Sequence, residues 1–204
     1  RRMKSDNLNN SRPIDVHVYL LTLLVTFFLS ITPTLLLSQE SNGSVDYTNP
    51  FNYFSEKDFS SHLEYFRSKE AFDAGHHLLA FEALQPLAEE GYDMPQALLG
   101  VMHEKGYGTV QDYDIAFHWY RLSAMQGNAQ GQLRLATMYQ AGNGAVADNV
   151  LAHMWFNIAS SNGNFLASKK RDLIAASGMT RLEMLKAHAM ARECIASGYQ
   201  LCRY

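Results

Sequence analysis

A block of 36 residues occurs twice in this chain, and this repeat constrains the fold more than any other feature of the sequence. Gly91, Gly127 and Gly163 are spaced 36 residues apart, and the two blocks between them align without a gap. A catalytic site is normally encoded once, whereas a block repeated in register encodes a building unit that stacks on its own copy. The sequence therefore predicts an array of repeated units.

The matched positions of the two blocks have clear roles in a pair of helices. Two glycines supply the left-handed backbone that ends one helix and reverses the chain, and the aspartate that follows caps the next helix. A small alanine and a large tryptophan then share the inner face. The frame comprises Leu99, Gly106, Gly108, Asp112, Ala116, Trp119 and Gly127 in one block and Leu135, Gly142, Gly144, Asp148, Ala152, Trp155 and Gly163 in the next, with Gln96/Gln132 and Met102/Met138 also matched.

The apolar spacing predicts two helices per unit. In the first of the two blocks we expect helices over Pro95–Lys105 and Tyr113–Gln126. Ala116, Trp119 and Tyr120 follow the i, i+3, i+4 spacing of one helical face, which we expect to be buried. The unit is therefore predicted to be a helix-turn-helix.

Weaker copies of the pattern flank the two clear ones. Residues 71–92 place Ala80 at the small-residue position and are expected to complete a degenerate first unit, after a helix over Ser61–Ala74. Downstream, a helix is expected over Phe165–Ser177, and a capping box at Thr180–Glu183 opens a final helix. End units of stacked arrays are atypical because their outer faces meet water.

The chain is thus divided into six predicted parts. They are an N-terminal signal peptide or membrane anchor (1–38), a polar linker (39–58), a degenerate helical repeat or cap (59–91), two repeats (92–127 and 128–163) and C-terminal capping helices (164–204).

The N-terminal part contains a long uncharged stretch, residues 16–38. As a helix, Val18–Leu37 would be about 30 Å long, the thickness of the hydrocarbon core of a bilayer. Basic residues precede it and acidic residues follow it, which favours a cytoplasmic N-terminus. The stretch is interpreted as a cleaved signal peptide, a retained membrane anchor or a buried helix of the domain. The first two readings place the repeats outside the cytoplasm, as a periplasmic, secreted or membrane-anchored domain.

Composition argues against nucleic acid as a partner. The chain has 17 Lys and Arg against 20 Asp and Glu, a formal net charge of -3, so it offers no basic field to neutralise phosphates.

The two cysteines, Cys194 and Cys202, allow two readings. Along an unbroken helix their Cα atoms would lie about 12 Å apart, too far for a disulfide. Gly198 lies between them and can end the helix and turn the chain back. We expect a disulfide in an oxidising compartment, with two free thiols as the alternative; the spacing does not fit a zinc site.

Eight histidines are the residues that most favour an enzyme. However, His118 and His153 do not occupy equivalent repeat positions, and no metalloprotease, hydrolase or phosphate-binding motif occurs. His103 stands at a core position and is interpreted as a packed side chain. We expect no catalytic residue, metal site or cofactor.

The frame residues resemble the Sel1-like repeat family, a 36-residue relative of the tetratricopeptide repeat, and point to an exported bacterial-type member. The resemblance implies an all-α fold, a right-handed superhelix (α-solenoid) of stacked antiparallel helix pairs. It also implies an adaptor whose concave face, lined by the first helix of each unit, holds a partner protein or peptide. Some secreted members carry a disulfide in each repeat and are linked to β-lactams; this chain has no cysteine in its repeats, so that chemistry is not transferred.

Specificity is expected where the two copies differ. Four differing positions of the first helix follow i, i+4, i+7 and i+11 and form one helical stripe away from the core. The alternative is a plain solvated face with the partner bound elsewhere. The stripe consists of Met94, Leu98, Val101 and Lys105 in one unit and Gln130, Arg134, Thr137 and Ala141 in the next.

The sequence thus predicts a non-catalytic scaffold of the cell envelope or secreted space. Two alternatives stay open: a structural or regulatory subunit of a membrane assembly, favoured by a retained anchor, and a secreted hydrolase-like enzyme.

Overall fold

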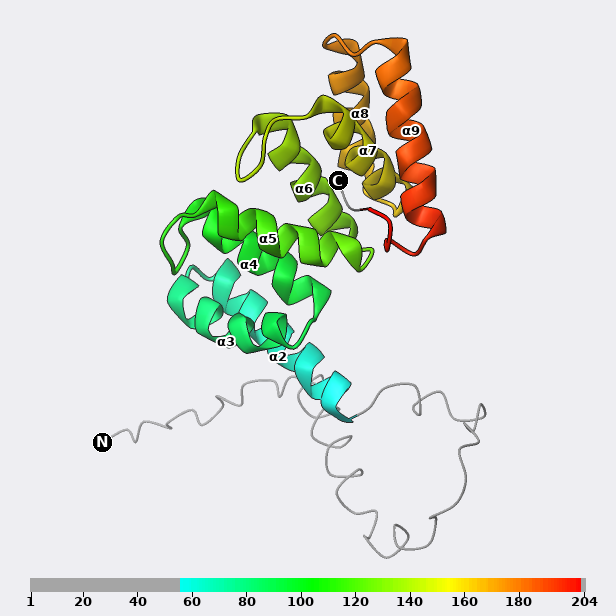
Figure 1. Ribbon diagram of the computed structural model, residues 1–204. Helices are drawn as coiled ribbons and strands as arrows, with labels where there is room; N and C mark the ends of the chain where they lie inside the picture. The colour runs from blue at the N-terminus through cyan, green and yellow to red at the C-terminus, as the bar shows by residue number, and fades with distance from the viewer. Residues whose placement is uncertain (1–55, 203–204) are drawn as a thin grey trace, which may run out of the picture. The chain divides into compact units, whose positions relative to one another are not determined.

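The computed structural model describes residues 56–202, which lie within one compact unit, Tyr53–Tyr204. These residues form eight α-helices and no strand, and helices that follow one another in sequence pack side by side from α2 to α8 (Figure 1). The predicted all-α solenoid of stacked helix pairs is confirmed. The helices are α2 (Glu56–Asp73), α3 (His77–Glu89), α4 (Asp93–Lys105), α5 (Tyr113–Met125), α6 (Ala129–Ala141), α7 (Asn149–Ser161), α8 (Phe165–Ala176) and α9 (Arg181–Ala196).

The predicted N-terminal segment at 16–38 and residues 39–55 of the predicted linker lie outside the described residues. Within residues 56–202, no helix has the length and apolar character needed to cross a membrane.

Two predicted helix starts are wrong by a few residues. α2 is already helical at Glu56, where the described residues begin, rather than from Ser61, and α4 begins at Asp93 rather than Pro95. α4 opens with an acidic residue, Asp93, whose negative charge is favourable at the positive end of the helix dipole. The capping box of Thr180 and Glu183 at the start of α9 is confirmed.

The loop between the two helices of a unit is built as predicted. Gly106 and Gly142 end α4 and α6 in the left-handed conformation, with φ of 71° and 74°. The Asp112 carboxylate accepts hydrogen bonds from two free N–H groups at the start of α5, and Asp148 does the same for α7. The first unit replaces this loop with a short turn at Gly75.

The second glycine of each loop makes a contact between units. Gly108 and Gly144 also have positive φ, and a Cβ atom on either would collide with a backbone carbonyl. These carbonyls belong to His77 and Tyr113, the first residues of α3 and α5. Each loop therefore rests directly on the start of the second helix of the preceding unit, an approach that only glycine permits.

A buried glutamine bridges each of the two repeats to the unit before it. Gln132 in α6 donates its side-chain N–H to the Ala124 carbonyl of α5, and its Oε1 accepts a hydrogen bond from Asn162 after α7. Gln96 makes the equivalent pair of bonds one unit earlier, to the Ala88 carbonyl and from Gln126. The same amide thus joins its own unit to the one before it.

The tryptophan positions differ in burial, against the prediction that both complete the core face. Trp155 is buried, whereas Trp119 is only partly buried at the edge of the N-terminal core cluster. Tyr120, the next residue, is fully buried, as is its counterpart Phe156, and the Tyr120 ring packs where Gly100 of α4 has no side chain. Trp155 is more enclosed because α7 is covered by three helices, α6, α8 and α9.

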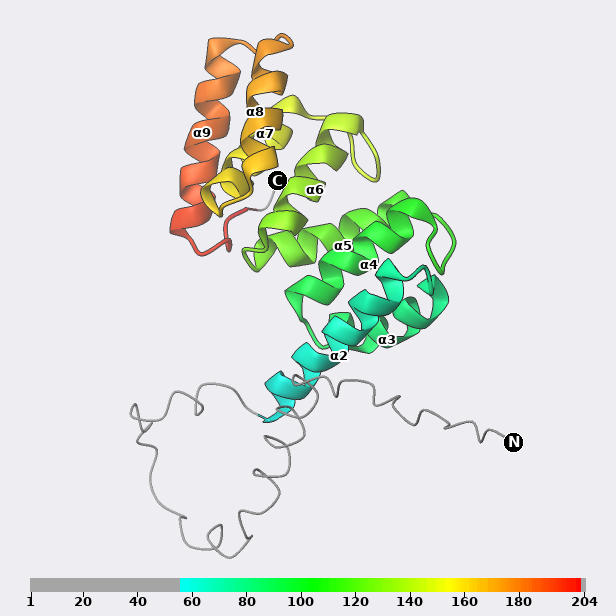
Figure 2. The ribbon, with the colours of Figure 1, turned by 180° about the vertical axis from the view of Figure 1, so that it is seen from behind.

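The last unit departs from the repeat. α9 packs along α7 and makes little close contact with α8, so α8 and α9 both lie on α7 (Figures 1 and 2). The predicted disulfide between Cys194 and Cys202 is confirmed, with both residues buried and their Cα atoms 4.9 Å apart. It ties down the tail, in which the Tyr199 hydroxyl lies 2.8 Å from Nδ2 of Asn162.

We predict that Gly144→Ala destabilises the protein more than Gly163→Ala. Both glycines have positive φ, so alanine is strained at either position by about 1–2 kcal/mol, but only Gly144 faces a backbone carbonyl. The free energies of unfolding in urea should therefore differ by more than about 1 kcal/mol. Equal losses in the two variants would show that the loop does not bear on the preceding unit.

Reducing the disulfide should lower the free energy of unfolding by about 2–3 kcal/mol, because the bond closes a short loop and limits the unfolded chain. Thermal melting with and without reductant measures the loss. Cys194→Ala/Cys202→Ala is the matched variant, and its melting should not respond to reductant.

A candidate interaction face on the first helices

The structure leaves the predicted stripe accessible. Its members on α4 and α6 are exposed or partly exposed, whereas the frame residue Leu99 and its counterpart Leu135 are buried. Leu98 and Val101 rest partly on the core beneath them, each against a different core cluster. The stripe is therefore a surface supported by the core.

One carboxylate joins the two halves of the stripe. Glu104 of α4 lies 3.6 Å from the Arg134 guanidinium of α6, pairs with Lys105 at 2.6 Å and accepts a hydrogen bond from the Tyr120 hydroxyl at 2.7 Å. Burial alone would raise the pKa of Glu104, but the hydrogen bonds from Lys105 and Tyr120 and the charge of Arg134 lower it below its usual value. Glu104 therefore stays ionised and holds both cationic side chains in place.

The equivalent positions of the neighbouring first helices, α2 and α8, extend this surface. The sequence analysis did not identify them. His62 and Tyr65 of α2 lie 36 residues before Leu98 and Val101. In α8, Leu166, Lys170 and Leu173 lie 36 residues after Gln130, Arg134 and Thr137 and are exposed or partly exposed. The 36-residue offset was the signal that could have identified them. We call the set from α2, α4, α6 and α8 the first-helix face.

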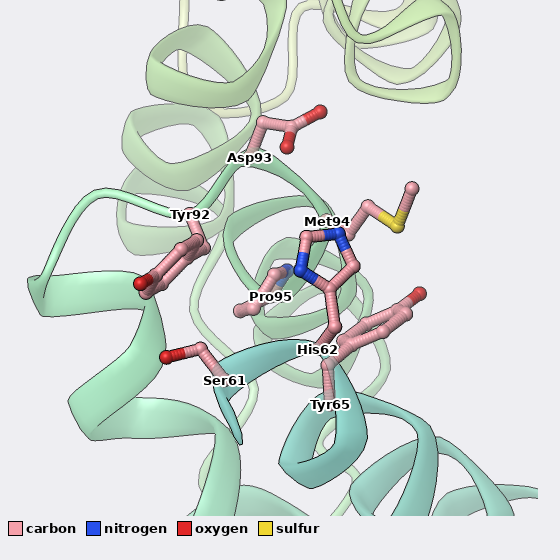
Figure 3. Close-up of a pocket in the computed structure, with 7 residues that line it drawn as sticks. All are labelled: Ser61, His62, Tyr65, Tyr92, Asp93, Met94 and Pro95. Carbon is pink, nitrogen blue, oxygen red and sulfur yellow. The ribbon is translucent and has the colours of Figure 1, made fainter. Parts of the chain in front are cut away.

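A small pocket lies where α2 meets the start of α4 (Figure 3). Figure 3 shows the rings of His62 and Tyr65 near Met94 and Pro95, with Asp93 pointing away. Its volume is about 40 Å³, enough for the tip of one side chain. The pocket is lined by Ser61, His62, Tyr65, Tyr92, Asp93, Met94 and Pro95.

The first-helix face changes in chemistry along its length. Between α2 and α4 it presents aromatic and apolar groups around the pocket, and on α6 it presents Gln130, Arg134 and Thr137. The Arg134 Nε is buried without a hydrogen-bond partner among the described residues. This arrangement suits a ligand with an apolar group at one end and hydrogen-bond acceptors at the other.

Of the histidines that favoured an enzyme, His103 and His153 are buried, whereas His118 is exposed. His103 is buried with its ring edge against Phe81, as predicted for a core position. His153 of α7 is buried with its ring against His188 of α9, and burial, His188 and Arg171 lower its pKa to about 4. Across residues 56–202, no group of His, Cys, Asp and Glu is arranged to hold a metal ion.

Comparison with known proteins agrees with this architecture. The model of the Sel1 repeat matches residues 96–128 and 129–164. No curated protein sequence matches the chain.

Two solved structures are similar to the chain. One is the crystal structure of c5321, a protective antigen present in uropathogenic Escherichia coli strains and displaying an SLR fold. It aligns with a TM-score of 0.64 and 24% identity over 68% of this chain, which spans only 31% of c5321. The other is a Sel1 repeat protein from Oxalobacter formigenes, with a TM-score of 0.50 and 29% identity over 55% of this chain and 87% of that protein. At these identities the likeness concerns the fold.

We predict that the buried His153 makes the protein acid-sensitive. Its pKa of about 4 in the folded state lies below the usual 6.5, so its contribution to stability is complete above pH 6.5 and is lost as the pH falls toward 4. His153→Phe copies the residue at the equivalent position, Phe117, and does not titrate. Between pH 7 and 4 the variant should lose about 2–3 kcal/mol less unfolding free energy than the parent. Superimposable pH profiles in urea would contradict this assignment.

Proposed function

We propose, from the premise that residues 96–128 and 129–164 are two Sel1 repeats, that this chain is a non-catalytic scaffold binding a partner protein or peptide along its first-helix face. Sel1 repeat proteins generally mediate protein–protein interactions. The observation that carries the proposal is the contrast between frame and stripe on the first helices: Leu99/Leu135 and Met102/Met138 are identical and buried, whereas the stripe positions differ and are exposed or partly exposed.

The chemistry of the face supports an extended or helical peptide as the ligand. The pocket beside Met94 takes one small apolar side chain, and Leu98 and Val101 continue the apolar surface along α4. Arg134 and Gln130 on α6 then offer donors for carbonyl or carboxylate oxygens. Because Glu104 and Arg134 are paired before binding, little side-chain order remains to be imposed.

We further propose that the repeats act outside the cytoplasm, in the cell envelope or the secreted space. Two features support this location: the uncharged stretch at residues 16–38, and the buried disulfide between Cys194 and Cys202, which persists in an oxidising compartment.

The test places a photoreactive group at Thr137 of the full chain and identifies the captured protein by mass spectrometry. A matched group at Arg121, an exposed residue of the second helix α5, is the control. The proposal expects one dominant partner from Thr137 and none from Arg121. Capture from Arg121 alone would move the site to the second helices, and capture from neither position would contradict the scaffold function.

Binding of the purified partner then tests the individual residues. Arg134→Ala and Met94→Ala should each weaken binding by about tenfold or more, whereas Arg121→Ala should leave it unchanged. Circular dichroism checks that Arg134→Ala, which removes one partner of Glu104, remains folded. Equal affinities for all three variants would contradict the first-helix face as the site.

A further inference from the structure

The outer side of α2 exposes a row of large apolar side chains. Phe59, Leu63 and Phe66 are 70%, 45% and 54% exposed and follow the i, i+4, i+7 spacing of one helical face. Beside this row, α2 and α3 form a groove of about 450 Å³, and both Leu63 and Leu79 line it. Leu78 and Leu79 at the start of α3 are also mostly exposed. We call Phe59, Leu63, Phe66, Leu78 and Leu79 the leading face.

The repeat shows what normally covers this side of a first helix. In α4, the positions 36 residues later are Pro95, Leu99 and Met102, all of which are buried. Leu99 and Met102 form one core cluster with Ala80, Leu84 and Ala88 of α3. The second helix of one unit thus covers the first helix of the next. On α2 the same side is apolar, but no helix among residues 56–202 covers it.

The other end of the array offers a second helix with a free side. α9 buries Ala187 and Ala191 against the core, and no later unit among the described residues covers its opposite side. Leu182 and Leu185, 76% and 57% exposed, begin a row on that side. We call this row the trailing face; it consists of Leu182, Leu185, Ala189 and Arg192. α2 and α9 lie at opposite ends of the row of helices (Figures 1 and 2).

The two ends carry opposite charge. Residues 56–91 contain eight Asp and Glu against three Lys and Arg, whereas residues 164–202 contain six Lys and Arg against three Asp and Glu. The apolar row of α2 continues into Glu70 and Asp73, and the row of α9 is flanked by Lys186 and continues into Arg192. Like ends therefore repel one another and unlike ends attract.

We propose that the leading face of one copy of this chain docks on the trailing face of a second copy, head to tail. α9 of one molecule then covers α2 of the next, as α3 covers α4 within the chain. Such a contact uses two different surfaces, so it adds one molecule after another and builds rows, either open or closed into a ring. It leaves the stripe on α4 and α6 open, so each row presents many copies of the proposed binding face.

The test measures the mass of the full chain by sedimentation in mild detergent, as a function of concentration. Leu63→Glu blocks the leading face and Leu185→Glu blocks the trailing face; both residues are exposed, so the fold should persist, which thermal melting checks. We expect the parent chain to form a series of oligomers. Each variant alone should be monomeric.

An equimolar mixture of the two variants gives the decisive result. One intact leading face and one intact trailing face remain in the mixture, so we expect a one-to-one dimer and nothing larger. Association of the parent should also weaken at least tenfold between 0.05 and 0.5 M salt, because opposite charges meet across the contact. A monomeric parent, oligomers that persist in either variant alone, or a mixture that stays monomeric would each overturn the proposal.

Discussion

Contact between successive units is the interaction on which the rest of this structure depends. A pair of short helices cannot bury its apolar side alone, so each unit is completed by its neighbour. Here the neighbour is held by two devices that recur every 36 residues: the buried amide of Gln96 or Gln132, and the loop glycine at 108 or 144. Both tie a unit to the second helix of the unit before it, so register and spacing are fixed together.

This contact also decides which residues are free to act. The frame residues pack within and between the units, so the accessible positions of the first helices can vary without loss of stability. Glu104 connects the packed interior with the accessible surface: it accepts a hydrogen bond from the buried Tyr120 and holds Arg134 and Lys105 at the surface. The proposed binding face thus consists of accessible first-helix positions that differ between the copies, on a scaffold held together by the packing between units.

Much of the architecture could be predicted because it depends on residues close together in the sequence: the period, the loop glycines, the aspartate caps and the turn that allows the disulfide. What escaped prediction depends on contacts between distant helices. Met154 of α7 is fully buried, while His118 at the equivalent position of α5 is exposed, since only α7 is also covered by α9. The Gln96/Gln132 match could be seen in the sequence. The hydrogen-bond partners of these side chains could not be predicted, because they depend on how the helices pack.

The most direct test of this account compares Gln132→Leu with Gln130→Leu by urea unfolding. The two residues lie on the same helix, but Gln132 bridges two units from the core and Gln130 is exposed on the stripe. Leucine at 132 removes two hydrogen bonds, one to the Ala124 carbonyl and one from Asn162, so we predict a loss of about 1–3 kcal/mol, against less than about 0.5 kcal/mol at 130. Equal stability of the two variants would contradict the claim that the buried amide holds the units together.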